Sequence, residues 1–116
     1  MKFLSLQPFI PSGKDFGKSK NFFVDLGFTI SWEAGDFIGF VKDDCRFILQ
    51  KYDHKEFAEN LMINVAIDNA DTFFNLIKEK QLEQKYGIKL GNPTNQPYGK
   101  EVNVIDLAGV CWHFVQ

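Results

Sequence analysis

The last eleven residues, 106–116, read DLAGVCWHFVQ, and they decide how the rest of the chain is interpreted. Residues 106–109 are typical of a tight turn, and the residues that follow are typical of a strand. His113, one of only two histidines, lies in the middle of that strand. The direction in which this imidazole points separates three interpretations: a metal centre, a binding pocket or a plain core.

The length and composition indicate one globular domain that spans residues 1–116. The net charge is −2 and no basic stripe is present, so we expect no nucleic-acid partner. No apolar run approaches the roughly 18 residues that a membrane span requires, so we expect no membrane partner. Thirteen Phe residues suit either a Phe-packed core or an apolar pocket.

The two cysteines indicate a reducing compartment. Cys45 and Cys111 lie 66 residues apart, inside apolar runs and without a CxxC pairing. Reduced thiols are therefore expected rather than a disulfide. The apolar run at the N-terminus is too short for a signal peptide and is interrupted by Pro8. We expect a cytoplasmic protein.

The first half of the chain predicts a strand, a helix and a meander. Residues 2–10 alternate with a period of two, as in a strand. Asp15 and Gly27 are suited to the two ends of a helix that turns Phe22 and Phe23 inward. Segments 28–34, 37–41 and 45–51 are apolar or β-branched and are separated by tight turns, which predicts three strands.

The second half repeats this order after a polar segment, 52–59, which is the one candidate linker and can form a short helical turn. We predict a strand over 60–67, a helix over 70–80, a loop over 86–99 that holds a short strand at 88–90, and strands over 101–105 and 110–115. The Phe73-Phe74 pair corresponds to Phe22-Phe23. The repeat predicts an α+β fold of two βαβββ modules, residues 1–56 and 57–116. One helix covers one face of each sheet, so the other face awaits a partner or a ligand.

Four motifs carry a resemblance to a known superfamily. Residues 15–28, DFGKSKNFFVDLGF, resemble a "D…S…FY…LGF" pattern, and 67–71, IDNAD, resemble "VDDVD". Residues 92–99, NPTNQPYG, resemble "P…PWG", and 106–109, DLAG, resemble "DPDG". In this order the motifs resemble the vicinal oxygen chelate superfamily, in particular its glyoxalase/bleomycin-resistance-protein group.

The resemblance implies a curved mixed sheet in which two modules surround a cavity, and it implies a homodimer. Many members use four side chains to bind a divalent metal, and this metal polarises the oxygens of a substrate. The bleomycin-resistance branch has no metal and binds a bulky ligand in clefts at the dimer interface.

Comparison with the four metal positions of the superfamily leaves one good ligand. The positions fall at His113, at Met62, at Gln7 or Phe9, and at Leu49 or Gln50. One imidazole beside amide and apolar groups does not suit a hard divalent ion. We therefore expect no metal site, no other cofactor and no assigned catalytic residue.

The alternation of the strands and the 91–100 loop instead predict a pocket. If Trp112 and Phe114 pack under the helices, His113 faces the concave side. The candidate ligand-binding residues are Gln7, Phe9, Phe47, Leu49, Met62, Asn64, Tyr98, Cys111 and His113. This set is mostly apolar with scattered polar groups, as in small-molecule pockets. Filling of the interior by the chain's own side chains is the competing interpretation.

Three functions follow from these observations. The first is metal-independent binding of an apolar or aromatic small molecule at the module or dimer interface, in the manner of antibiotic-resistance proteins. The second is a metal-dependent lyase, isomerase or dioxygenase that uses His113 with Gln7, Gln50 or Glu101. The third is a scaffold dimer without a ligand. A Cys111–His113 nucleophile is disfavoured because side chains two residues apart on a strand lie about 7 Å apart.

Overall fold

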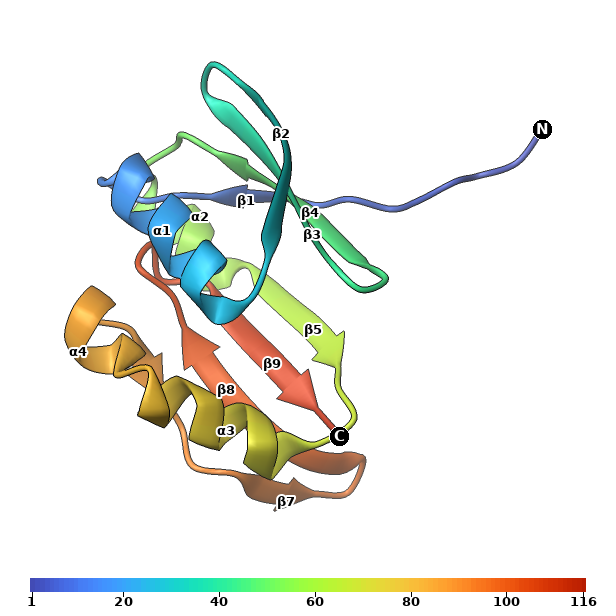
Figure 1. Cartoon of the computed structure of the whole chain (residues 1–116), viewed down its shortest axis with the longest axis vertical. Helices are drawn as coiled ribbons and strands as arrows, with labels where there is room; N and C mark the ends of the chain where they lie inside the picture. The colour runs from blue at the N-terminus through green and yellow to red at the C-terminus, as the bar shows by residue number, and fades with distance from the viewer.

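The computed structural model describes all 116 residues (Figure 1). The first half contains β1 (Phe9–Pro11), α1 (Phe16–Leu26), β2 (Thr29–Ala34), β3 (Phe37–Lys42) and β4 (Cys45–Gln50). The second half contains α2 (Lys55–Asn60), β5 (Met62–Ala66), α3 (Ala70–Glu79), α4 (Leu82–Tyr86), β6 (Lys89–Leu90), β7 (Thr94–Gln96), β8 (Gly99–Ile105) and β9 (Cys111–Val115). No helix combines the length and the apolarity needed to cross a membrane.

The strands form two sheets, one from each half of the chain. Sheet A has the order β1-β4-β3-β2, and sheet B has the order β5-β9-β8-β6 with β7 paired to β8. In each sheet the first strand runs parallel to the last strand of its half, β1 beside β4 and β5 beside β9. The predicted α+β class and its repeated element order are confirmed. The second half also contains α4 and β7, which the sequence pattern did not predict.

The helix ends lie where the sequence predicted them. Asp15 caps α1 by accepting a hydrogen bond from the backbone N–H of Lys18. Gly27 ends α1 with a φ of 120°, a conformation that glycine adopts without strain. Asn69 caps α3 in the same way through the N–H of Thr72. These caps fix where each helix begins on its sheet.

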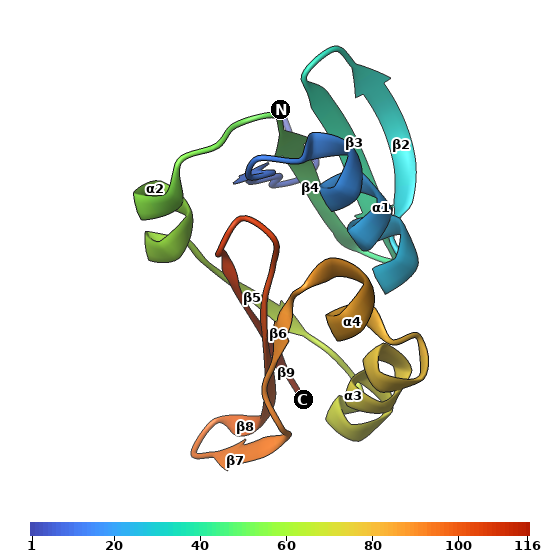
Figure 2. The same cartoon turned by 90° about the vertical axis from the view of Figure 1, so that its left-hand side faces the viewer.

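The helices lie on one face of each sheet, and aromatic rings join the two halves. Phe23 of α1 packs on sheet A, with its ring centroid 4.8 Å from Phe47. Phe73 of α3 packs on sheet B, 4.1 Å from Phe114. Phe23 also lies 5.5 Å from Trp112 of β9, so a single core runs through both halves. Figure 2 shows α2 on the opposite side of the molecule from α3 and α4.

A polar contact between α1 and α4 supports the same junction. The Tyr86 hydroxyl donates to Asp25 Oδ2 at 2.5 Å, and Lys85 Nζ lies 3.1 Å from the same oxygen. The hydrogen bond from Tyr86 holds the pKa of Asp25 below its usual value, and Lys85 acts in the same direction. Burial and the Asp25 carboxylate raise the pKa of Tyr86 to about 12. The two halves are thus locked by a charged hydrogen bond as well as by the core.

The N-terminal strand is much shorter than predicted. Only Phe9–Pro11 pair with β4, whereas the sequence predicted a strand over 2–10. Residues 1–7 extend away from the body of the molecule (Figure 1), and we call them the N-terminal arm. Phe3, Leu4 and Leu6 are each at least 90% exposed. The alternating pattern is therefore present, but within one chain the arm has no surface on which to bury its apolar side.

Candidate ligand-binding site

The turn before β9 sets the position of the site. Asp106 is buried, and its Oδ1 accepts the backbone N–H groups of Ala108, Gly109 and Val110 at 3.0–3.1 Å. Its Oδ2 accepts the indole N–H of Trp112 at 2.9 Å. Burial raises the pKa of this carboxyl to about 6, against the lowering effect of the four hydrogen bonds. The turn therefore holds Trp112 toward the core.

The alternation of β9 then sends His113 to the other face of sheet B. Trp112 and Phe114 are 2% and 3% exposed and pack in the core, as predicted. Cys111, His113 and Val115 lie on the opposite side of the strand, on the face without a helix. We call this side of sheet B the open face.

Three neighbouring strands contribute side chains to one row of the open face. His113 lies directly opposite Asn64 of β5 on one side and Asn103 of β8 on the other. Met62 and Cys111 are partners one step along the strands, and Cys111 also faces Ile105. Directly opposite residues have their Cβ atoms about 5 Å apart. The side chains of Asn64, His113 and Asn103 therefore form a continuous polar row.

A buried carboxylate organises this row. Glu101 of β8 is only 6% exposed. Its Oε1 lies 2.9 Å from Nδ1 of His113, and its Oε2 accepts the hydroxyl of Tyr98 at 2.9 Å. Since an ionised carboxylate only accepts hydrogen bonds, Nδ1 of His113 must carry a proton. Glu101 thus fixes the orientation of the ring and the position of its protons.

Two polar atoms beside this carboxylate have no partner. Nε2 of His113 and Oδ1 of Asn103 are buried and make no hydrogen bond within the chain. A buried polar atom without a partner typically costs about 1–3 kcal/mol, which is why most such atoms are satisfied. Their presence together on one face indicates a group that is supplied from outside the chain.

The negative charge of Glu101 is felt across the open face. The hydrogen bond to Glu101 raises the pKa of the Tyr98 hydroxyl. Burial raises the pKa of the Cys111 thiol, and the carboxylates of Glu101 and Asp106 raise it further. A thiol with a raised pKa is a poor nucleophile at neutral pH. The site therefore favours recognition of donors over attack by Cys111.

The structure brings five of the nine predicted site residues together. Met62, Asn64, Cys111 and His113 lie on the open face, and Tyr98 joins them through Glu101. Met62 and Tyr98 are 68% and 64% exposed. These five residues come from β5, from β9 and from the turn between β7 and β8, which are far apart in the sequence.

Two predicted residues lie on the wrong side of sheet A. Phe47 is 2% exposed and Leu49 is 0% exposed, and both pack in the core under α1. The prediction that they line the pocket is wrong. The run from Phe47 to Leu49 is apolar at three consecutive positions, so its periodicity could not show which side faces the helix.

The other two predicted residues lie away from sheet B. Phe9 of β1 is 53% exposed, and its ring meets Phe37 edge-on at 5.9 Å on sheet A. Gln7 belongs to the N-terminal arm, where its side-chain amide donates to Ser5 at 2.8 Å. Neither side chain is a neighbour of His113 within one chain.

Sequence reasoning missed Asn103 as a member of the site. The signal was present: Glu101 and Asn103 alternate with the apolar Val102 and Val104 in the predicted strand 101–105. That alternation indicates one buried face and one polar face. The sequence suggests Glu101 only as a metal ligand, whereas in the structure its contact with His113 is a hydrogen bond.

Sheet A carries a different surface on the side that α1 leaves uncovered. The Trp32 indole lies flat against Gly39, where a Cβ atom would meet Trp32 Nε1 at 2.1 Å. Gly39 is therefore required for this placement of the ring, which remains 41% exposed. With Phe9 and Phe37 beside it, this side of sheet A is an aromatic surface.

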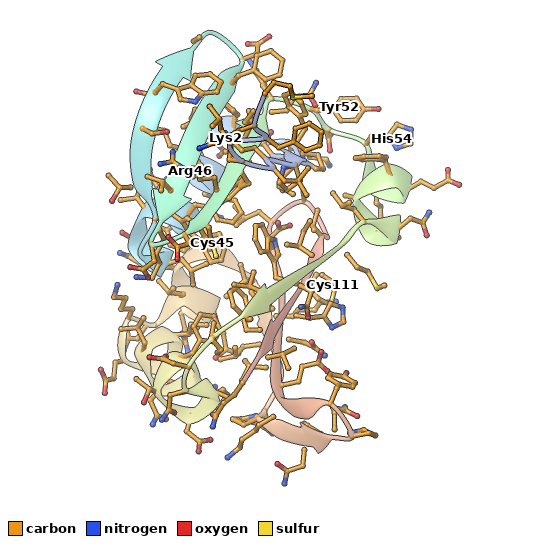
Figure 3. All side chains as sticks on the ribbon, turned by 90° about the vertical axis from the view of Figure 1, so that its right-hand side faces the viewer. Lys2, Cys45, Arg46, Tyr52, His54 and Cys111 are labelled. Carbon is orange, nitrogen blue, oxygen red and sulfur yellow. The ribbon has the colours of Figure 1, made fainter.

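Two clefts lie at opposite ends of the junction between the halves. The first has a volume of about 720 Å³ and includes Ile105, Lys89 and Cys111, so it adjoins the His113 row. The second has a volume of about 520 Å³ and includes Cys45, Phe28 and Phe73. Figure 3 shows Cys111 and Cys45 well separated, on different sheets. The first cleft is the one that includes Cys111, the neighbour of His113 on the open face.

The residues of the site do not fit a divalent metal. No group of three or more His, Cys, Asp or Glu side chains lies close enough to hold a metal ion. The partner of His113 is the carboxylate bonded to its Nδ1, and the neighbouring positions are Asn64, Asn103 and Met62. Zinc sites in proteins generally use three or four charged or imidazole ligands.

No protein-family model matches the chain, and no curated protein matches it significantly by sequence. Solved structures do match. The bleomycin-binding protein of bleomycin-producing Streptomyces verticillus, complexed with copper(II)-bleomycin, has a TM-score of 0.76 and 24% identity and covers 99% of this chain and 97% of that chain. A bleomycin resistance determinant encoded on the transposon Tn5 has a TM-score of 0.81 and 18% identity, with 98% of each chain covered.

A metal-containing structure matches over a similar length. The fosfomycin resistance protein FosX of Listeria monocytogenes, complexed with Mn(II) and sulfate, has a TM-score of 0.75 and 12% identity and covers 99% of this chain and 90% of that chain. The chain therefore has the fold of the vicinal oxygen chelate superfamily. The resemblance predicted from the sequence motifs is confirmed at the level of the fold.

Proposed function

We propose that this chain is a metal-independent binding protein for an apolar or aromatic small molecule. The observation that carries the proposal is the open face of sheet B. There Glu101 orients His113, and the buried atoms Nε2 of His113 and Oδ1 of Asn103 have no partner. Fixed polar groups near a cleft of about 720 Å³ support recognition of a small molecule, and the cleft itself carries charged side chains such as Lys89 and Asp106 beside apolar ones such as Ile105.

The aromatic part of the proposal is supported by sheet A. Trp32 on Gly39, together with Phe9 and Phe37, offers exposed ring faces and edges. Aromatic rings favour offset-stacked and edge-to-face contacts with other rings. Two of the similar structures carry names that refer to bleomycin, in one case as the bound ligand. Those names support a ligand of this kind for the present fold.

Metal independence is supported by the donor set around His113. A thioether at Met62 and amides at Asn64 and Asn103 are weak ligands for hard divalent ions. The Nδ1 side of the ring already faces Glu101. We expect no tight binding of Zn, Mn, Ni, Co or Fe(II) by the purified protein.

We further propose that the protein acts as a homodimer in the cytoplasm. The arm presents Phe3, Leu4 and Leu6 to solvent, each at least 90% exposed. A second copy of the chain can cover this apolar strip and the open faces of both sheets. Light scattering of the wild type and of a Leu4→Ser/Leu6→Ser variant measures the oligomeric state of each protein. A dimer that dissociates in the variant is expected, and a wild-type monomer at micromolar concentration contradicts the proposal.

The binding function is tested by a thermal-shift screen of aromatic small molecules beside a metal panel. A ligand that binds the folded state raises the melting temperature by mass action, by an amount set by the ratio of its concentration to Kd. We expect aromatic hits that are lost in a Glu101→Leu variant and unchanged by chelator. One tight metal ion per chain, or the complete absence of hits, would contradict the proposal.

A second candidate is an enzyme that uses His113 as a proton acceptor. The observation in its favour is the Glu101–His113 pair, because a carboxylate on Nδ1 leaves Nε2 available as a base. The raised pKa values of the Tyr98 hydroxyl and the Cys111 thiol keep both groups protonated at neutral pH, so neither is a second base on the open face. Turnover of a bound ligand that is abolished by His113→Gln would favour this candidate over simple binding.

A further inference from the structure

The two histidines of the chain make opposite hydrogen bonds. His54 caps α2, and its Nδ1 accepts the backbone N–H of Phe57 at 3.0 Å. His113 directs Nδ1 at a carboxylate, which only accepts. A neutral His54 therefore carries its proton on Nε2, and a neutral His113 carries its proton on Nδ1. Nε2 of His113 is then a free acceptor.

Asn103 adds a second acceptor at the same place. It lies directly opposite His113 on the neighbouring strand, and its Oδ1 is buried without a partner. The two atoms are not bonded to each other, since both lack any partner. Glu101 lies behind them with a carboxylate that is 6% exposed. This corner of the open face thus offers acceptors and negative charge, and no donor of the chain bonds to either acceptor.

The 720 Å³ cleft gives a route to this corner. Cys111 precedes His113 on the open face, Ile105 follows Asn103, and both residues line the cleft. A ligand body in the cleft therefore contacts the strand positions next to the two acceptors, Cys111 before His113 and Ile105 after Asn103. Tyr98 is 64% exposed and its side chain is held by a single hydrogen bond to Glu101, so it can turn aside when a ligand enters.

We infer that the His113–Asn103 corner is a subsite for a nitrogen group that donates two hydrogen bonds, such as an amidinium, a guanidinium or a primary amide on an aromatic body. One N–H is accepted by Nε2 of His113 and another by Oδ1 of Asn103. The Glu101 carboxylate favours the cationic members of this class. The inference rests on the proposed binding function and names the chemistry of its ligand.

The test uses four aromatic probes of similar size: benzamidine, benzamide, acetophenone and benzoate. They differ in donors and charge while they keep the ring. Binding is followed by NMR of protein labelled with ¹⁵N-histidine, in which only His54 and His113 contribute. At a pH at which both rings are neutral, we expect the proton of His54 on Nε2 and the proton of His113 on Nδ1. A His113 ring with Nε2 protonated in the free protein overturns the inference without any variant.

With probes, we expect benzamidine to bind best, benzamide next and the two probes without N–H groups worst. The span should be at least about tenfold, because each hydrogen bond that involves a charged group is worth about that factor. Only the His113 ring signals should move. An Asn103→Leu variant should remove the preference, while His54→Asn, which keeps a capping residue on α2, should retain it.

The outcomes separate the subsite from the broader function. If all four probes bind alike and ignore Asn103→Leu, the subsite is wrong and the binding function stands. If none binds and the aromatic screen also finds nothing, both are wrong. Movement of the His54 signals alone places the probes at α2, beside Tyr52 and away from Cys111 (Figure 3), and also overturns the subsite.

Discussion

Sheets A and B share an element order, and their core faces are alike, but their open faces are not. On sheet A the uncovered side carries Trp32 against Gly39 with Phe9 nearby. On sheet B it carries a buried carboxylate at Glu101 that holds His113. The core sides require only that apolar rings pack under a helix. The difference teaches that the repeated βαβββ order specifies the scaffold, whereas the open faces carry the chemistry.

The largest effect should come from the turn that orients β9 of sheet B. Asp106→Ala leaves the backbone N–H groups of Ala108 and Val110 and the indole N–H of Trp112 without their carboxylate acceptor, whereas the Gly109 N–H keeps its bond to the Asp106 backbone carbonyl. We expect a loss of about 3 kcal/mol or more in the free energy of unfolding, measured by urea denaturation.

Two matched variants sharpen this result. Asp106→Asn keeps an oxygen for the backbone groups and fails only at Trp112, so its loss should be smaller. Asp36→Ala, in the exposed β2–β3 turn of sheet A, should change stability by less than about 0.5 kcal/mol. Equal losses at Asp36 and Asp106 would show that the two sheets do not differ in this respect.

An intermediate effect is expected at Glu101. Glu101→Gln keeps the shape but removes the charge, and one of its two acceptors becomes a donor that faces Tyr98 or His113. We expect a loss of about 1–2 kcal/mol. The pKa of Tyr98 should fall toward its usual value, since the hydrogen bond to Glu101 is what raises it. Titration of tyrosinate absorbance measures this, with Tyr86, whose pKa is about 12, as an internal control. An unchanged pKa of Tyr98 would contradict the hydrogen-bonded arrangement of Tyr98, Glu101 and His113.

A smaller effect, dependent on pH, is expected where the halves meet. The folded pKa of Asp25 is lowered, so its ionised form stabilises the folded state. That contribution is fully present above the unfolded pKa of about 3.9 and is lost as the pH falls through the folded value. Asp25→Asn should therefore cost about 1 kcal/mol at pH 7 and progressively less as the pH falls below the unfolded pKa of about 3.9. A deficit that grows in acid would have the wrong sign for this contact.

The smallest effect on stability should be at the aromatic surface of sheet A. Gly39→Ala places a Cβ where the Trp32 indole lies, and the ring, already 41% exposed, must swing into solvent. We expect a change in stability below about 1 kcal/mol with a red shift of tryptophan fluorescence, since Trp112 remains buried. No spectral shift would show that Trp32 does not rest on Gly39.

Much of this architecture was predictable, and the failures have physical causes. The helix caps at Asp15 and Gly27 and the side of β9 that carries His113 followed from local chemistry and from a period of two. The side of β4 did not, because Phe47 to Leu49 is apolar on both faces. The arm over residues 1–7 was predicted as part of a strand because its pattern needs a partner surface that one chain lacks.

The candidate site was only half predictable. His113 and its row were found from alternation, but the hydrogen bond to Glu101 depends on how β8 pairs with β9. The alternation of residues 101–105 indicates that Asn103 lies on the polar face of its strand, but an amide does not stand out among candidate metal ligands. The metal-ligand positions of the superfamily indicate where a site lies, whereas the unpartnered polar atoms of the folded chain indicate which chemical groups the site can bind.

Ligand binding at the open face of sheet B is tested most directly by comparing the alkylation rates of the two cysteines. Cys111 lies on the open face beside His113, and Cys45 lies on sheet A at the other cleft (Figure 3). The rates of iodoacetamide alkylation of both thiols are measured by mass spectrometry, with and without an aromatic ligand from the screen at saturation. We expect the bound ligand to slow the alkylation of Cys111 and to leave the alkylation rate of Cys45 unchanged. Protection of Cys45 alone, or of neither thiol while the ligand is bound, would contradict this expectation.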